Sequence, residues 1–169
     1  MNIPTLEVQS SQLQRTVGDA YLKLQLNQQI SAVLSMAHVQ EALAVPVGRI
    51  TLMPNMPACV LGLLNQRSQV LWIIDLPQML DLPTLDTEVQ HYSIAIIRVG
   101  SIPLGLVVQE VKGVMRFSVD SIQSPIGAVA PSLVPYLRGC ILQSTEVLLV
   151  LDAEAIANSP LLHSNESLR

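Results

Sequence analysis

The chain has 169 residues, of which 50% are hydrophobic and only 13% are charged, whereas about 25% charged residues are usual in soluble domains. This composition excludes a disordered chain, because disorder requires low hydrophobicity and high net charge. Nine basic residues against thirteen acidic residues give a net charge of −4, and the basic residues are scattered along the chain. We therefore exclude nucleic acid as a main partner, since a phosphate-binding surface needs clustered basic side chains.

Segments that cross a membrane or direct secretion are not expected. The longest apolar run, 56–64, is much shorter than the roughly 20 residues of a membrane-spanning helix, and the start of the chain lacks the features of a secretory signal. We therefore expect a cytoplasmic protein without membrane insertion, in which Cys59 and Cys140 are buried free thiols. We also expect flexible segments at 1–17 and 160–169 around a folded domain at 18–159.

Short alternating or β-branched segments predict that most of the chain is β-structure. The segment 21–26 alternates apolar and polar residues, and a polar turn at Asn27-Gln28-Gln29 joins it to the apolar segment 30–34 as a hairpin. The other predicted strands are 70–74, 92–99, 102–108, 111–117 and 147–151, with a hairpin turn at Gly100-Ser101. Short helices are predicted at 36–43, 57–63, 76–80 and 153–158.

An internal repeat is the most informative pattern. A shift of 77 positions gives six identities over the 22 positions from Pro54 to Asp75, and a shift of 71 to 72 aligns the earlier part of each copy, including 39–43 with 111–115. The identical pairs are Pro54 and Pro131, Gly62 and Gly139, Gln66 and Gln143, Val70 and Val147, Leu71 and Leu148, and Asp75 and Asp152. Two copies of one plan predict two small β-barrels, one from each half, packed over an apolar seam.

Patterns for catalysis or metal binding are lacking. His38 and Glu41 would share one face of the helix predicted at 36–43, but two ligands do not make a metal site. Asp75 and Asp152 each end a hydrophobic strand before a short helix, which predicts helix caps rather than acid–base catalysts. We therefore expect no enzyme and no cofactor. The high apolar content with few charges favours a protein-binding module.

Several motifs resemble the CheW family of chemotaxis coupling proteins. The strongest runs from Val60 to Leu76 and contains Gly62-Leu63-Leu64-Asn65-Gln66-Arg67 before a strand that ends in Asp75-Leu76. The others are Leu26-Asn27-Gln28-Gln29-Ile30, Met36-Ala37-His38-Val39-Gln40-Glu41, Ile50-Thr51-Leu52-Met53-Pro54-Asn55-Met56-Pro57 and Gly105-Leu106-Val107-Val108-Gln109-Glu110-Val111. The resemblance covers 20–159. Ser68 and Gln109 depart from the family pattern, which has glycine and aspartate at these positions.

The resemblance implies two pseudo-symmetric, five-stranded, SH3-like β-barrels with a few short helices. It also implies a cytoplasmic, non-enzymatic adaptor that couples methyl-accepting receptors or photoreceptors to the regulatory domain of a CheA-type histidine kinase in membrane-associated arrays. Such adaptors serve chemotaxis, phototaxis or type IV pilus motility. The residues that fall on contact positions of the family are Val39, Glu41, Gly62, Asn65, Arg67, Gly105, Val111 and Val114.

Arg67 is the main candidate for partner binding, because a guanidinium on a polar turn offers a planar fork of donors to a carboxylate or carbonyl. The alternative interpretations are a solvated turn arginine at Arg67, a helix-face charge at Glu41, and a purely backbone role for the glycines. A second hypothesis from a different class is a small-ligand sensor with an apolar pocket between the two barrels.

Overall fold

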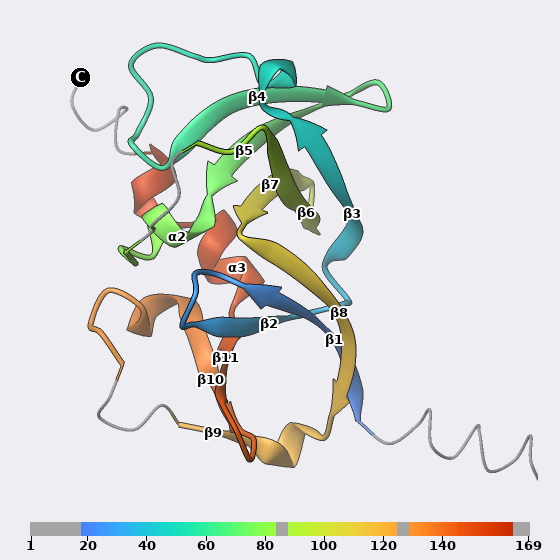
Figure 1. Ribbon diagram of the computed structural model, residues 1–169, viewed down its shortest axis with the longest axis vertical. Helices are drawn as coiled ribbons and strands as arrows, with labels where there is room; N and C mark the ends of the chain where they lie inside the picture. The colour runs from blue at the N-terminus through green and yellow to red at the C-terminus, as the bar shows by residue number, and fades with distance from the viewer. Residues whose placement is uncertain (1–17, 84–87, 125–128, 164–169) are drawn as a thin grey trace, which may run out of the picture.

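The protein consists of two packed β-sheets with short helices at their junction (Figure 1). The computed structural model describes residues 18–83, 88–124 and 129–163. The strands are β1 (Asp19–Gln25), β2 (Ser31–Ser35), β3 (Val39–Pro46), β4 (Val60–Gln66), β5 (Gln69–Asp75), β6 (His91–Val99), β7 (Ile102–Val108), β8 (Glu110–Phe117), β9 (Ile122–Gln123), β10 (Leu137–Leu142) and β11 (Val147–Leu151). The helices are α2 (Leu76–Met79) and α3 (Ala153–Ala157), with 3-10 turns η1 (Val47–Arg49), η2 (Val119–Ser121), η3 (Val134–Tyr136) and η4 (Pro160–His163).

Each of the two sheets closes into a barrel, because a segment of the chain runs from one edge strand of the sheet to the opposite edge. The sheet with strand order β8-β1-β2-β11-β10-β9 forms the lower barrel, in which the chain passes from β8 through η2 to β9 beside β10. The sheet with order β3-β6-β7-β5-β4 forms the upper barrel, in which the chain passes from β3 through η1 to Thr51 beside β4. Thr51 and Leu63 exchange backbone hydrogen bonds of 2.8 and 2.9 Å. These closures confirm the predicted class of two small β-barrels. The lower barrel has six strands rather than the expected five, because the short β9 pairs with β10.

The two halves of the sequence exchange strands, so the prediction of one barrel from each half is wrong. The order β1-β2-β3-η1-β4-β5-α2 recurs as β6-β7-β8-η2-β10-β11-α3, with β9 and η3 inserted between η2 and β10. However, β3 crosses into the upper barrel to pair with β6, and β8 crosses into the lower barrel to pair with β1 (Figure 1). Parallel pairing of β2 with β11 and of β5 with β7 then joins the halves within each barrel. Neither barrel is complete without both halves.

Two predicted helices are strands. Residues 36–43 contribute to β3, whose alternation of half-buried and exposed side chains has the period of a strand. Residues 57–63 contribute to β4, which pairs with β5, and β10 was not predicted. Both β4 and β10 carry an irregular register at a glycine, Gly62 or Gly139. These irregularities hide the alternation that identifies a strand.

The predicted short helices at 76–80 and 153–158 are confirmed as α2 and α3. Asp75 accepts a hydrogen bond from the backbone N–H of Gln78 at 3.3 Å, and Asp152 accepts one from Ala155 at 3.1 Å. Both aspartates are therefore helix caps, as predicted.

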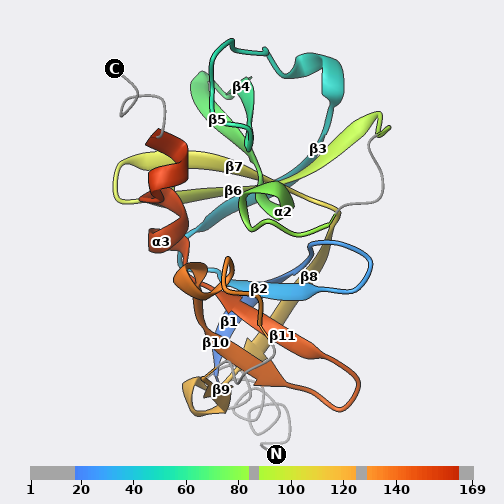
Figure 2. The same ribbon diagram turned by 90° about the vertical axis from the view of Figure 1, so that its left-hand side faces the viewer.

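The predicted apolar seam is confirmed. The largest core cluster contains Leu24 and Leu34 from the lower barrel, Ile74 and Leu106 from the upper barrel, and Ile156 from α3, all at most 1% exposed. Figure 2 shows α2 and α3 at this junction. Each such side chain stabilises the folded state by about 1.5–3 kcal/mol on burial. The barrels therefore form one body rather than two independent domains.

The two cysteines are buried free thiols, as predicted. Burial is the main cause that raises the pKa of the Cys59 thiol, so its reactive thiolate form is disfavoured. None of the helices in the described residues has the length and apolar character needed to span a membrane.

Candidate functional site

The β4–β5 hairpin ends in a tight turn that presents Arg67. Arg67 and Ser68 have φ angles of 53° and 63°, as required at the two central residues of a type I′ turn. This turn matches the twist of the flanking strands and makes the hairpin project from the upper barrel (Figure 1). The Arg67 side chain is 79% exposed, so its guanidinium is accessible to a partner.

Glu41 orients this arginine from the neighbouring edge of the barrel. The distance between Arg67 Nη2 and Glu41 Oε2 is 3.3 Å, and Gln66 Nε2 donates a hydrogen bond of 3.5 Å to Glu41 Oε1. The helix-face interpretation of Glu41 is wrong, because the residue lies on β3. An exposed ion pair adds only about 0–1 kcal/mol to stability. The pair therefore adds little stability, and it places the Glu41 carboxylate beside the Arg67 guanidinium.

A small cavity lies beside this ion pair. Its volume is about 320 Å³, and it is lined by Gln40, Glu41, Gln66, Arg67, Gln69, Leu71 and Ile96. Asn65 is nearby on β4, and its carbonyl oxygen accepts a 2.9 Å hydrogen bond from Arg49 Nη2. The structure thus brings three of the predicted residues, Glu41, Asn65 and Arg67, to one end of the upper barrel.

The predicted glycines have structural roles in their immediate surroundings. Gly62 is buried with φ 151°, and a Cβ atom there would overlap the carbonyl oxygen of Thr51. A Cβ atom at Gly105 would approach Ile73 Cδ1 to 2.5 Å inside the upper barrel. These contacts support the backbone interpretation of both glycines.

The predicted valines lie at other places. Val39 and Val111 are partly buried against the seam between the barrels. Val114 is 58% exposed and lies on β8, in the lower barrel rather than beside Arg67. The eight predicted residues therefore do not form one continuous site.

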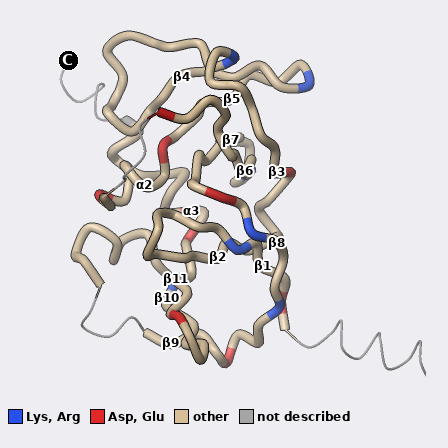
Figure 3. The backbone as a smooth tube through the Cα atoms, viewed as in Figure 1, with Lys and Arg blue, Asp and Glu red and all other residues tan. Residues whose placement is uncertain are grey.

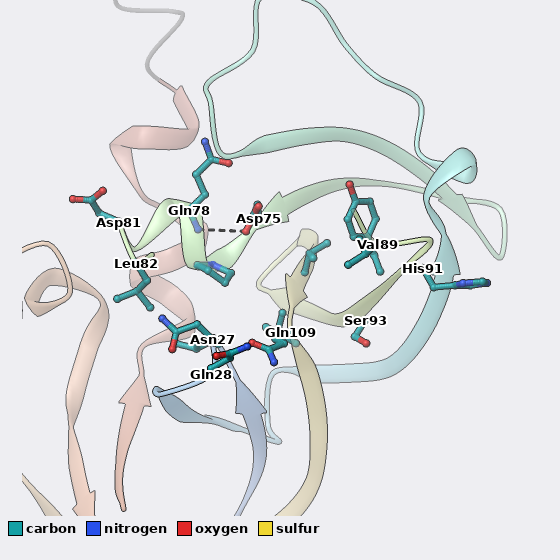
Figure 4. A pocket seen from close by; sticks show the side chains of 15 residues that line it. Asn27, Gln28, Asp75, Gln78, Asp81, Leu82, Val89, His91, Ser93 and Gln109 are labelled. Atoms are coloured by element: carbon teal, nitrogen blue, oxygen red, sulfur yellow. Dashed lines mark hydrogen bonds between the residues drawn. The ribbon is translucent and has the colours of Figure 1, made fainter. Parts of the chain in front are cut away.

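A larger groove lies between the barrels, where the ligand-sensor hypothesis expects a pocket, but none of its lining residues was predicted as such. It has a volume of about 670 Å³ and includes Asn27, Asp75, Asp81, Ser93 and Gln109 among its lining residues. Figure 4 shows Asn27 and Gln109 on one side, facing Asp75 from the other. The lining comes from the β1–β2 turn, α2, β6 and β7, which are distant in sequence, so no local motif indicates it. Its many polar side chains do not match the apolar pocket of the ligand-sensor hypothesis.

The groove is acidic next to α2, where Asp75 and Asp81 line it. Burial is the main cause that raises the pKa of the Asp75 carboxyl, while the backbone hydrogen bond from Gln78 opposes this shift. Charged residues are otherwise sparse over the fold (Figure 3). In the described ranges, no group of three or more His, Cys, Asp or Glu side chains could hold a metal ion.

An exposed apolar stripe lies on the outward face of the upper barrel, next to the Arg67 hairpin. Val70 is 59% exposed, Trp72 is 37% exposed and Ile102 is 39% exposed. Val70 and Trp72 are two residues apart on β5, so they face the same side. Because contiguous exposed apolar patches mark interaction surfaces, this stripe is a candidate surface of that kind.

Comparisons with known proteins agree with this architecture. The sequence model described as the CheW-like domain matches residues 20–161. A protein named chemotaxis protein CheW, from Treponema pallidum (strain Nichols), is 29% identical over 109 residues, which are 63% of this chain and 64% of that relative's length. The crystal structure of scaffolding protein TtCheW from Thermoanaerobacter tengcongensis has the same fold, with a TM-score of 0.70, 19% identity, and coverage of 80% of this chain and 90% of the other. Since the domain match spans most of the sequence, the protein belongs to the CheW-like domain family.

Proposed function

We propose that this protein is a non-enzymatic adaptor that couples methyl-accepting receptors to a CheA-type histidine kinase in chemotaxis-like signalling. Membership of the CheW-like domain family supports this proposal, as do the names of its relatives, a chemotaxis protein and a scaffolding protein. The observation that carries the proposal is that two barrels with a shared core present two separate surfaces. These are the Arg67 end of the upper barrel and the groove between the barrels.

The Arg67 surface is proposed to bind the regulatory domain of the kinase. The exposed guanidinium, held by Glu41, offers directed donors to a carboxylate or carbonyl, and Asn65 adds an exposed polar side chain. The apolar stripe around Trp72 supplies a surface whose burial would add affinity. Gly62 and Gly105 act indirectly in this proposal, because they allow the close packing that holds the surface in shape.

The groove is proposed to bind the helical tip of a receptor, because helices commonly bind in grooves that also have apolar lining residues, here Leu26, Val107 and Val108. Val39, Val111 and Val114 are proposed to support or contact receptor-facing surfaces near the strands that cross between the barrels. In the cell, the adaptor is proposed to be cytoplasmic and recruited to membrane-associated receptor arrays.

Calorimetric titration of the purified protein with the kinase regulatory domain and with a receptor cytoplasmic fragment, both from the same organism, tests the proposal. The wild type is expected to bind both partners. Arg67→Ala is expected to weaken kinase binding by about tenfold, as befits loss of a charge-assisted contact of roughly 1.4 kcal/mol, without affecting receptor binding.

Arg138→Ala is the matched control, because Arg138 is an exposed arginine on β10 of the lower barrel. It should bind the kinase domain as the wild type does. Absence of binding to either partner by folded wild-type protein would contradict the adaptor function. Full kinase affinity of Arg67→Ala would remove Arg67 from the kinase site.

A further inference from the structure

The cavity beside Arg67 lies between two edge strands of the same sheet. β3 and β4 are at opposite ends of the strand order in the upper barrel, and both contribute residues to the cavity lining. In the described residues, one isolated bridge, Thr51 with Leu63, joins the segment after β3 to β4. Beyond that bridge, toward the hairpin tip, no backbone pairing joins β3 to β4 in the described part of the chain.

Side chains span this opening instead of backbone hydrogen bonds. Glu41 on β3 contacts Gln66 at the end of β4 and Arg67 in the turn. Below these contacts, the cavity reaches Leu71 and Ile96, which are buried in the core of the upper barrel. The opening is thus a slot between β3 and β4, with the buried side chains of Leu71 and Ile96 at its base and an arginine at its rim.

The repeat provides an internal comparison for the free edge of β3. Residues 41–45 of β3 correspond to 113–117 of β8, which is the edge strand of the lower barrel. The outward residues of this stretch are Ala42 and Ala44 in β3, whereas the corresponding residues in β8 are Val114 and Arg116. Bulky and charged outward residues protect an edge strand from pairing with other chains. At Ala42 and Ala44 the β3 edge lacks this protection, and the charge that β3 carries at the slot is that of Glu41.

We propose that an extended, acidic segment of the kinase partner adds as a strand in the slot between β3 and β4. This inference rests on the proposed adaptor function and specifies how the Arg67 surface recognises the kinase. An extended chain is the occupant that can hydrogen-bond to unpaired strand edges. The acidic character follows from charge, because Arg67 is 79% exposed and Arg49 lies nearby, whereas Glu41 is the one acidic residue lining the cavity.

The added strand takes the place of the side-chain contact between Glu41 and Gln66, and it places a carboxylate at the rim and an apolar side chain above Leu71 and Ile96. The carboxylate accepts hydrogen bonds from the Arg67 guanidinium, whose fork geometry suits this acceptor. The next side chain along the strand points the opposite way, toward Leu71 and Ile96. Ala42 and Ala44 leave the approach to β3 open because they carry no bulk beyond a methyl group.

Residue-resolved hydrogen exchange of the full chain, with and without a saturating amount of the kinase regulatory domain, tests strand addition directly. We expect two groups of amides to exchange at least tenfold more slowly in the complex. The first group is the alternate amides of 41–45 that do not bond to β6, and the second is the amides of 64–66 on the side facing β3. Amides of 113–117 on β8 should be unchanged. Unchanged exchange on β3 and β4 in a saturated complex would overturn the proposal.

A pair of variants at one exposed position provides an independent test. Ala42→Asp puts a carboxylate beside the acidic segment and is expected to weaken kinase binding at least tenfold, while Ala42→Ser keeps the residue small and neutral and should bind within twofold of the wild type. Receptor binding by both variants should equal that of the wild type, which confirms their fold.

The outcomes separate this inference from the adaptor function. If the wild type binds the kinase domain and Ala42→Asp binds equally well, strand addition is wrong and the adaptor function stands. If the wild type does not bind the kinase domain, both proposals fail. A third outcome is slow exchange of the β3 amides in the absence of the kinase domain, with fast exchange after residues 1–17 are removed. This outcome would identify the chain's own N-terminal segment as the occupant and would also overturn the proposal.

Discussion

Replacement of Gly62 by alanine separates the two interpretations of this glycine, contact with a partner and closure of the upper barrel. Gly62 has φ 151°, and an added Cβ atom would overlap the Thr51 carbonyl oxygen and lie 2.9 Å from its carbon. Thr51 is the residue that closes the barrel through two hydrogen bonds to Leu63. The alanine methyl group therefore strains the backbone and pushes the closing segment away from β4.

The expected cost combines two effects. A side chain held in this sparsely populated backbone region costs about 1–3 kcal/mol, and each lost closing hydrogen bond costs about 0.5–1.5 kcal/mol. We expect Gly62→Ala to lower the free energy of unfolding by about 3 kcal/mol, which corresponds to a drop in Tm of about 6–12 °C for a chain of this size. Urea and thermal unfolding followed by the fluorescence of Trp72 measure both quantities.

Two other glycines serve as controls. Gly139 is the repeat equivalent of Gly62, with φ 156° and the Gln123 carbonyl oxygen in the way of a Cβ atom, so Gly139→Ala should cost a similar amount. At Gly48 an added Cβ atom meets nothing within 4 Å, and Gly48→Ala should stay within about 0.5 kcal/mol of the wild type. A Gly62→Ala protein as stable as the wild type would refute the closure argument.

Three further predictions concern the turn, an ion pair and the thiols. Ser68→Gly should stabilise the protein by about 0.5–1 kcal/mol in urea unfolding, because glycine adopts the φ of 63° without the strain of a side chain; equal or lower stability would contradict this. The hydrogen bond from Lys23 is the main cause that lowers the pKa of the Glu146 carboxyl in the folded protein. This pair therefore stabilises the folded state fully at pH values above the unfolded pKa of about 4.5. The stabilisation is lost as the pH falls through the lowered pKa of the folded protein. The wild type should therefore lose more stability than Glu146→Gln when unfolding is compared at about pH 6 and about pH 3, and identical losses would show that the pair has no effect. Cys59 and Cys140 are buried, so a thiol reagent should label both slowly in the native protein and rapidly in urea; rapid native labelling would place them at the surface.

The repeat made the order of the elements predictable, but not the exchange of strands between barrels. The repeat aligns 39–43 with 111–115, which lies in the predicted strand 111–117. This alignment therefore already indicated that 39–43 is a strand, β3, and not part of a helix at 36–43. The crossing of β3 and β8 between the barrels is set by the strands with which they pair. Local hydrophobic periodicity predicts that a segment is a strand, but it does not predict its pairing partner. Closing the barrels across the halves also buries the seam that contains Leu24 and Ile74.

The candidate site was predictable where it is local in sequence. Asn65 and Arg67 lie in one hairpin, and their polar side chains in an apolar neighbourhood mark the turn. The distance between Glu41 and Arg67 in the sequence concealed their ion pair, since β3 must leave its own hairpin to reach the upper barrel. The groove at Asp75 and Asn27 likewise depends on the tertiary packing of several elements that are distant in sequence.

Reconstitution of kinase activity is the most direct test of the adaptor function. Autophosphorylation of the CheA-type kinase would be measured with receptor-containing membranes, in the presence of wild-type protein, Arg67→Ala or no adaptor. We expect receptors to regulate the kinase when the wild-type protein is present, and we expect this regulation to be lost without the adaptor and weakened by Arg67→Ala. Kinase activity that is independent of the folded wild-type protein at every receptor concentration would show that the protein is not an adaptor.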